Sequence, residues 1–131
     1  MSTEQNKAVV RRFLESGLNV DALVDEVCSP DYVNHLVPGG REGAKQFFPM
    51  MRSAFPDLKF HTSIENQIAE GDYVAARITY HITNAGKEAT GYGVCEYRLA
   101  NNKIVEEWPP KDTAVLLQQV GAILPSGEGE G

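Results

Sequence analysis

The sequence predicts an α+β domain in which a curved antiparallel sheet wraps around N-terminal helices. Two observations carry this prediction. Apolar residues recur at helical spacing through most of residues 3–54, and they alternate at strand spacing through most of residues 58–108. Helices followed by an antiparallel meander are typical of an α+β architecture. We expect one domain over residues 1–122 and a flexible tail over residues 123–131, which are rich in glycine and glutamate.

Three helices are predicted before the sheet, over residues 3–16, 20–27 and 41–54. Ser2 or Thr3 can cap the first helix, Gly17 stops it, and Asn19 can cap the second. A short extended segment over residues 32–37 separates the second helix from the third. The apolar face of the first helix is predicted to consist of Ala8, Val9, Phe13 and Leu14.

Four strands are predicted to follow as a meander, over residues 58–69 and 73–83 and in the two arms of a hairpin within residues 92–108. Gly71 lies in the first turn. Asn101 and Asn102 supply the hairpin turn, because asparagine tolerates a left-handed backbone. Prolines at 109 and 110 end the last strand, and a final helical segment capped by Asp112 or Thr113 runs through residue 120.

Composition excludes several kinds of partner. The 131 residues include 12 basic and 18 acidic side chains, which give a formal net charge of -6. Nucleic acid and anionic membranes prefer basic surfaces, so we expect neither as a partner. The first residues show no basic region followed by an apolar one, and we expect a cytoplasmic protein. Cys28 and Cys95 are far apart in the sequence, which favours reduced thiols but leaves a disulfide open.

The candidate site rests on isolated polar residues that could face the space between sheet and helices, because no strong catalytic motif is present. The three histidines lack metal-ligand spacing, and we expect no metal and no other cofactor. Asn34 and His35 precede the loop to the third helix. The ordinary pKa of histidine is about 6.5, so His35 is the candidate general base. The alternative is a surface histidine without a catalytic role.

One face of the strand before the hairpin turn is expected to point inward. Cys95 and Tyr97 share that face, while Glu96 and Arg98 share the other. A buried Glu96 is the alternative, and its pKa would then rise into the range of an acid or base. We expect Asn34 and Tyr97 to hydrogen-bond a developing enolate oxygen. The predicted substrate-binding wall consists of Phe13, Phe47, Met51, Tyr80, Cys95 and Trp108.

Several segments in series resemble the SnoaL-like polyketide cyclase family. They are YVNH (32–35), GREGAKQF (40–47), AFPDL (54–58), EGDYVAAR (70–77), KIVEEW (103–108) and DTAVLLQQVG (112–121). The resemblance covers about residues 5–122. It implies a cystatin-like α+β cone, a hydrophobic small-molecule ligand, and frequently a homodimer formed through the open face of the sheet.

The resemblance also implies a catalytic aspartate directly after the tryptophan of the last strand and a histidine fourteen residues earlier. This chain has Pro109 and Cys95 at those positions. His35 matches the place where ketosteroid isomerase-like members of the superfamily keep an acidic base. We expect cofactor-independent acid–base chemistry of a cyclase, isomerase or lyase type on a hydrophobic, carbonyl-bearing molecule that is polyketide- or steroid-like. The alternative, which Pro109 favours, is a non-catalytic binding protein or dimeric association module.

Overall fold

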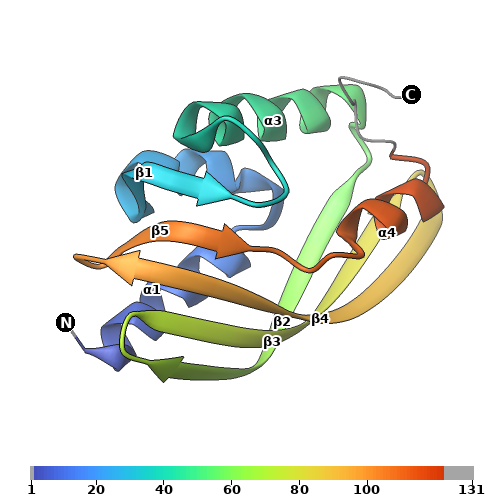
Figure 1. Cartoon of the computed structure of the whole chain (residues 1–131). Coiled ribbons are helices and arrows are strands. Elements are labelled where there is room, and N and C mark those ends of the chain that lie inside the picture. Colours follow the sequence, from blue (N-terminus) through green and yellow to red (C-terminus); the bar gives the residue numbers. More distant parts are fainter. Residues whose placement is uncertain (1, 123–131) are drawn as a thin grey trace.

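Within residues 2–122, which the computed structural model describes, five strands form one curved sheet and the helices cover its concave face (Figure 1). The strand order is β1-β5-β4-β3-β2, with β1 parallel to β5 and the other neighbours antiparallel. This confirms the predicted α+β class and curved sheet; the predicted tail over 123–131 lies outside the described residues. The elements are α1 (Thr3–Glu15), the 3-10 helix η1 (Gly17–Leu23), α2 (Val24–Val27), β1 (Cys28–Asn34), α3 (Gly40–Ala54), β2 (Lys59–Glu70), β3 (Tyr73–Asn84), β4 (Lys87–Ala100), β5 (Lys103–Trp108) and α4 (Thr113–Gln119).

Helix α1 begins at a complete capping box. Ser2 Oγ accepts a hydrogen bond from the backbone N–H of Gln5 at 3.0 Å, and the Ser2 N–H donates to Gln5 Oε1 at 3.2 Å. Such reciprocal bonds satisfy two N–H groups that have no partner inside the helix. The apolar face differs from the prediction: Val10 and Phe13 are buried, whereas Ala8 is exposed.

The predicted second helix is wrong in its form. Residues 17–23 form a 3-10 helix, and only one α-helical turn, α2, follows it. Asn19, the predicted cap, lies inside η1 with non-helical dihedral angles of φ -98° and ψ 17°. The extended segment begins at Cys28, four residues earlier than predicted, and adds a fifth strand beside β5. Pro30 fits within β1 because an edge strand has no further neighbour that needs its N–H group.

Tight turns join the antiparallel strands where they are predicted. Gly71 connects β2 to β3 with a φ of 58°. Asn101 and Asn102 connect β4 to β5 with φ values of 55° and 63°, the left-handed backbone that asparagine adopts more readily than most residues.

The pairing of β5 with β4 contains a one-residue irregularity. Two adjacent residues of β4 pair with Glu106 and Ile104, so Val105 is left over as a β-bulge. In a regular strand, residues three apart point to opposite faces. The bulge changes this, and both Ile104 and Glu107 are buried on the concave side.

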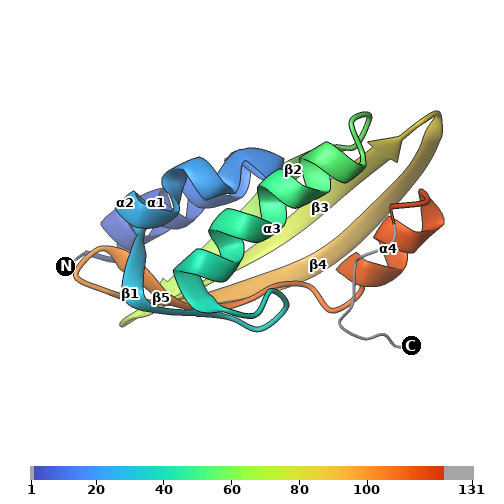
Figure 2. The same cartoon turned by 90° about the horizontal axis from the view of Figure 1, so that it is seen from above.

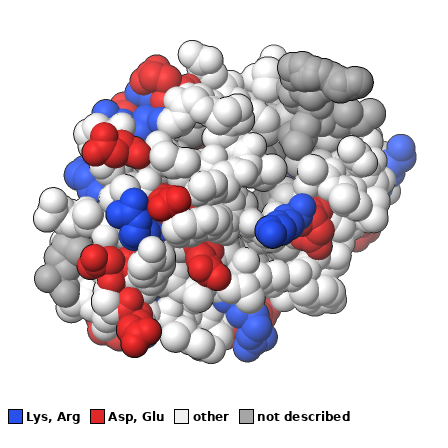
Figure 3. All heavy atoms as spheres, in the orientation of Figure 1, with Lys and Arg blue, Asp and Glu red and all other residues white. Residues whose placement is uncertain are grey.

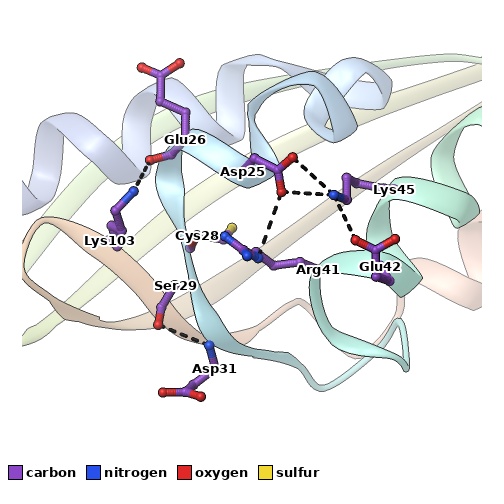
Figure 4. Close-up of polar contacts among 9 residues, drawn as sticks. All are labelled: Asp25, Glu26, Cys28, Ser29, Asp31, Arg41, Glu42, Lys45 and Lys103. Carbon is purple, nitrogen blue, oxygen red and sulfur yellow. Dashed lines mark hydrogen bonds and ion pairs between the residues drawn. The ribbon is translucent and has the colours of Figure 1, made fainter.

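An ion-pair cluster ties α3 to α2 and β1 (Figure 4). Lys45 Nζ lies 3.0 Å from Asp25 Oδ1 on α2 and 2.8 Å from Glu42 Oε2 on its own helix. Arg41 Nε lies 3.9 Å from Asp25 Oδ1, and its Nη1 donates to the backbone oxygen of Cys28 at 3.5 Å. Exposed pairs of this kind add little stability; here they link α3 to α2 and, through the Cys28 oxygen, to β1.

Helix α4 closes the end of the sheet that lies away from α1 (Figures 1 and 2). Leu116 packs closely on β4, because a Cβ built at Gly91 would come within 2.3 Å of Leu116 Cδ1. Asp112, one of the two predicted caps, makes no capping hydrogen bond with its side chain. It accepts a hydrogen bond from the hydroxyl of Tyr80 instead, which fastens the start of α4 to β3.

Acidic and basic side chains are interspersed on the face seen in Figure 3, and those of the described residues form no continuous basic patch there. None of the helices within residues 2–122 combines the length and the apolar character needed to cross a membrane.

Candidate active site

A cavity of about 130 Å³ lies between the concave face of the sheet and the helices. Side chains of α1, η1, α3 and α4 cover it, and strands β2 to β5 form its floor. Most of its wall is apolar, and three of its few polar side chains, Asn34, Tyr97 and Glu107, lie at one end. An apolar cavity with a small number of converging polar groups is typical of a small-molecule site.

Glu107 is at the centre of a hydrogen-bond network in this cavity. The residue is 7% exposed. Its Oε1 accepts from the hydroxyl of Tyr32 at 2.5 Å and from Nδ2 of Asn34 at 3.1 Å. Its Oε2 accepts from the hydroxyl of Tyr97 at 3.2 Å. Asn34 Nδ2 also donates to the Tyr32 hydroxyl oxygen at 3.0 Å. Side chains of β1 and β4 therefore hold the carboxyl group that β5 carries.

Burial raises the pKa of Glu107 from its ordinary value of 4.5 to about 7, although hydrogen bonds from Tyr32 and Tyr97 oppose part of the rise. Removal from water disfavours the charged carboxylate, whereas donated hydrogen bonds favour it. A carboxyl group with this pKa is present in both protonation states at neutral pH, which suits a general acid or base. A strongly shifted pKa inside a cavity is also a general indicator of a functional site.

Apolar neighbours pack against the network. Phe13 of α1 contacts two members edge-on, with ring centroids 6.2 Å from Tyr97 and 6.5 Å from Tyr32. Cys95 lines the cavity beside them, and burial raises the pKa of its thiol to about 12. The thiol is therefore neutral at ordinary pH and a poor nucleophile. Cys28 and Cys95 are both free and buried.

Seven of the nine predicted site residues line this cavity. Asn34 and Tyr97, which we predict to be catalytic, both bond to Glu107. The predicted wall residues that are present are Phe13, Phe47, Met51, Tyr80 and Cys95. Their parts in binding and catalysis stay predictions.

His35 and Trp108 lie outside the cavity. The side chain of His35 is 43% exposed, and its Nε2 lies 2.7 Å from Glu106 Oε2. The imidazole stacks on Trp108 with ring centroids 5.2 Å apart, and Trp108 stacks on the exposed Tyr73 at 6.2 Å. Asn34 points to the concave side. Successive side chains of an extended segment alternate between faces, so His35 points away from the concave side. The structure therefore brings neither the predicted base nor the predicted tryptophan wall to the cavity.

Glu107 is the site residue that sequence reasoning missed. Strict alternation from the apolar Ile104 puts Glu106 and Trp108 on the concave face and Glu107 outside. The bulge at Val105 reverses this assignment. The one hint in the sequence is the adjacent pair Glu106 and Glu107, of which a strand can point only one inward.

Glu107 lies close in the chain to Pro109, the position at which the resemblance implies an aspartate. The two residues are two apart in the chain, and both line the cavity. The concave face therefore keeps a carboxyl group, placed two residues before the position that the resemblance implies. Glu96, the alternative buried acid, is exposed.

The chain matches the family model described as SnoaL-like polyketide cyclase over residues 8–120. No curated protein matches it. Among solved structures, a candidate polyketide cyclase from Bacillus cereus is 24% identical, with a TM-score of 0.74 and coverage of 94% of this chain and 87% of that one. TsrD from Streptomyces laurentii is 18% identical, with a TM-score of 0.72 and coverage of 94% and 99%. AclR, a candidate hydroxylase from Streptomyces galilaeus, is 22% identical, with a TM-score of 0.66 and coverage of 90% and 97%.

At these identities the solved structures show a shared fold alone, and their descriptions name more than one activity. The family model supports a stronger conclusion than the shared fold, because it spans nearly all of the described residues and includes the strands and helices that form the cavity. This protein therefore belongs to the SnoaL-like polyketide cyclase family.

Proposed function

We propose that this protein is a cofactor-independent enzyme that moves a proton at the carbon next to a carbonyl group, with Glu107 as its acid–base residue. One observation supports this assignment above the others. A buried carboxyl group with a pKa of about 7 lines an otherwise largely apolar cavity and accepts three hydrogen bonds. The apolar wall favours a hydrophobic substrate, and the family supports a carbonyl-bearing one of the polyketide- or steroid-like kind.

In the proposed step, ionised Glu107 removes a proton from the α-carbon of the bound ketone. The electron pair of the broken C–H bond moves into the carbonyl group and forms an enolate. Oε2 is the better-placed base, because it accepts one hydrogen bond at 3.2 Å whereas Oε1 accepts two. Protonated Glu107 then returns the proton to another carbon, as in an isomerase. In a cyclase it returns the proton to the alkoxide formed when the enolate carbon attacks a second carbonyl of the same molecule.

Two neighbours of Glu107 have supporting roles in this scheme. Once Glu107 is protonated, Tyr97 is free to donate its hydroxyl hydrogen to the enolate oxygen, where a hydrogen bond is worth most in a dry site. Asn34 holds both Tyr32 and Oε1, and its own Oδ1 accepts from the backbone N–H groups of Leu36 and Val37 at 2.7 and 3.0 Å. Asn34 therefore connects the carboxyl group to the loop that forms one edge of the cavity.

Deuterium exchange tests the proposal without knowledge of the natural substrate. We expect the wild type to accelerate exchange of the α-protons of cyclic and polycyclic ketones in D2O at pH 8, followed by NMR. Glu107→Gln should reduce the exchange to the uncatalysed rate. Glu106→Gln changes the adjacent carboxylate on the other face of the sheet and should leave the exchange unaltered. Equal rates for Glu107→Gln and the wild type would exclude Glu107 as the base.

The second candidate function is a binding protein that performs no chemistry. Pro109, at the position where the resemblance implies an aspartate, supports it. Ligands that bind the native state raise the melting temperature by mass action. Ketones that raise the melting temperature of the wild type, but undergo no accelerated exchange, would favour this candidate.

We also propose that two copies associate through the convex face of the sheet. Tyr92 and Val94 of β4 and Tyr73 of β3 are 73%, 52% and 49% exposed there. Tyr92 and Val94 are neighbours on this face, whereas Tyr73 pairs with Arg98, four residues further along β4. Apolar side chains exposed side by side are a common mark of an interface. Sedimentation velocity should give a dimer for the wild type and a monomer for Val94→Glu. A wild type that stays monomeric at high concentration would refute the dimer.

A further inference from the structure

We propose that the cavity contains a second polar subsite, at the end away from Glu107, which binds a hydroxyl group of the ligand. Tyr80 of β3, Thr62 of β2 and Thr113 of α4 form it, and all three line the cavity. The inference rests on the proposed function in one respect: the carbonyl group of the ligand is placed at Glu107. It adds a second functional group to the ligand. It also explains why β4 has glycine at positions 91 and 93, where a side chain would crowd this end of the cavity.

Two glycines leave room for the ring of Tyr80 on the sheet. A Cβ built at Gly91 would come within 2.7 Å of Tyr80 Cζ, and one built at Gly93 would lie 3.1 Å from Pro110 Cβ and 4.0 Å from Tyr80 Cε1. Phe60 of β2 lies beside the tyrosine, with ring centroids 6.0 Å apart and planes within 17° of parallel. The two rings form one aromatic wall of the cavity, and the tyrosine contributes the only hydroxyl of that pair.

The hydroxyl hydrogens at this end are largely committed to protein partners. Tyr80 donates to the carboxylate of Asp112, and Thr113 Oγ1 donates to the backbone oxygen of Pro110 at 2.9 Å. Both oxygens keep lone pairs that can accept a hydrogen bond. Thr62 pairs with Tyr80 across β2 and β3, and its hydroxyl makes no hydrogen bond with any described residue.

This set of groups matches a hydroxyl better than a ketone or ether oxygen. A ligand hydroxyl can donate to Tyr80 or Thr113 and can also accept from Thr62. A ketone or ether oxygen can only accept, so it would leave the lone pairs of Tyr80 and Thr113 without a donor. Buried polar groups that lose a partner carry a free-energy cost, and this is the source of the expected discrimination.

The two polar ends are well separated along the sheet. Tyr80 pairs with Gly91 and its ring reaches to Gly93, and Tyr97 stands four residues further along β4, which corresponds to about 13 Å along the strand at 3.3 Å per residue. Ile78 and Cys95 line the stretch between them, and Met51 covers it from α3. A ligand that reaches both polar groups therefore carries a carbonyl group at one end, an apolar body and a hydroxyl at the other.

Matched ketones that differ by one hydroxyl test this subsite. The pairs are acetophenone with 4-hydroxyacetophenone, and 4-acetylbiphenyl with 4-acetyl-4′-hydroxybiphenyl, whose two lengths allow for the separation of the ends. Titration calorimetry should give a Kd about fivefold lower for the hydroxylated member of at least one pair. In the double variant Tyr80→Phe/Thr113→Val, which keeps Thr62, the ratio of the two Kd values should fall well below five. Because both ligands are compared in the same variant, a general loosening of α4 cancels from the ratio.

Two controls separate this inference from the proposed function. Tyr92→Phe removes a tyrosine hydroxyl from the outward-facing residue between the two glycines, and it should keep the fivefold ratio. Glu107→Gln should also keep the ratio while it abolishes exchange, so loss of exchange with an intact ratio concerns Glu107 alone. Equal Kd values within both pairs for the wild type would overturn the subsite. So would a ratio that persists in the double variant, or a failure of both hydroxylated ketones to bind.

Discussion

Replacing Glu107 with glutamine should stabilise the protein at alkaline pH while it removes the proposed activity. In the unfolded chain this carboxyl group ionises near its ordinary pKa of 4.5, whereas in the folded protein its pKa is about 7. Between these two values the folded state binds more protons than the unfolded state. The free energy of unfolding of the wild type therefore falls as the pH rises through this window, and it levels off above about pH 7.

The magnitude follows from the two pKa values. A rise from 4.5 to about 7 corresponds to about 3 kcal/mol of stability lost on full ionisation. Glutamine has no charge to remove from water, and its Oε1 can still accept from Tyr32 and Asn34. We expect Glu107→Gln to have a free energy of unfolding similar to that of the wild type below pH 5. At pH 8 it should exceed the wild type by up to about 3 kcal/mol.

Urea unfolding, followed by the fluorescence of the single tryptophan at pH 5, 6, 7 and 8, measures this difference. Glu106→Gln is the matched control. Hydrogen bonds from His35 and Arg98 hold the pKa of Glu106 below its ordinary value, so its replacement should bring no gain at pH 8. A difference between the wild type and Glu107→Gln that is the same at pH 5 and pH 8 would refute the buried, proton-binding carboxyl group.

Three further predictions concern single side chains. Tyr97→Phe should lower the exchange rate about 100-fold with little change in ligand affinity, because it removes the proposed enolate donor; an unchanged rate would contradict that role. His35→Ala should keep full exchange, since the imidazole lies outside the cavity, and a loss comparable to that of Glu107→Gln would restore His35 as the base. Gly91→Ala should destabilise the protein by about 1–3 kcal/mol in thermal unfolding, because its Cβ would meet Leu116. Thr90→Ala, at the exposed neighbouring position, should show no such effect.

Much of the fold follows from local features of the sequence. Helical and strand periodicity predict α1, α3 and the four antiparallel strands, and Asn101 and Asn102 predict the turn between β4 and β5. The alternation of β4 also places Tyr97 on the concave face. These predictions succeed because they depend on residues close together in the chain, where side-chain spacing and backbone preference act directly.

The acid–base residue depends instead on contacts between distant strands. The bulge at Val105 appears only when β5 is paired with β4, and it turns Glu107 inward in place of Glu106. Burial inside the packed sheet then raises the pKa of Glu107, and donors from β1 and β4 oppose part of the rise. Sequence patterns and the family resemblance predict the fold class, the family and five of the six proposed wall residues. Which carboxyl group enters the cavity, and at what pH it ionises, follows from the packed structure, because register and desolvation are properties of the whole sheet and not of any one strand.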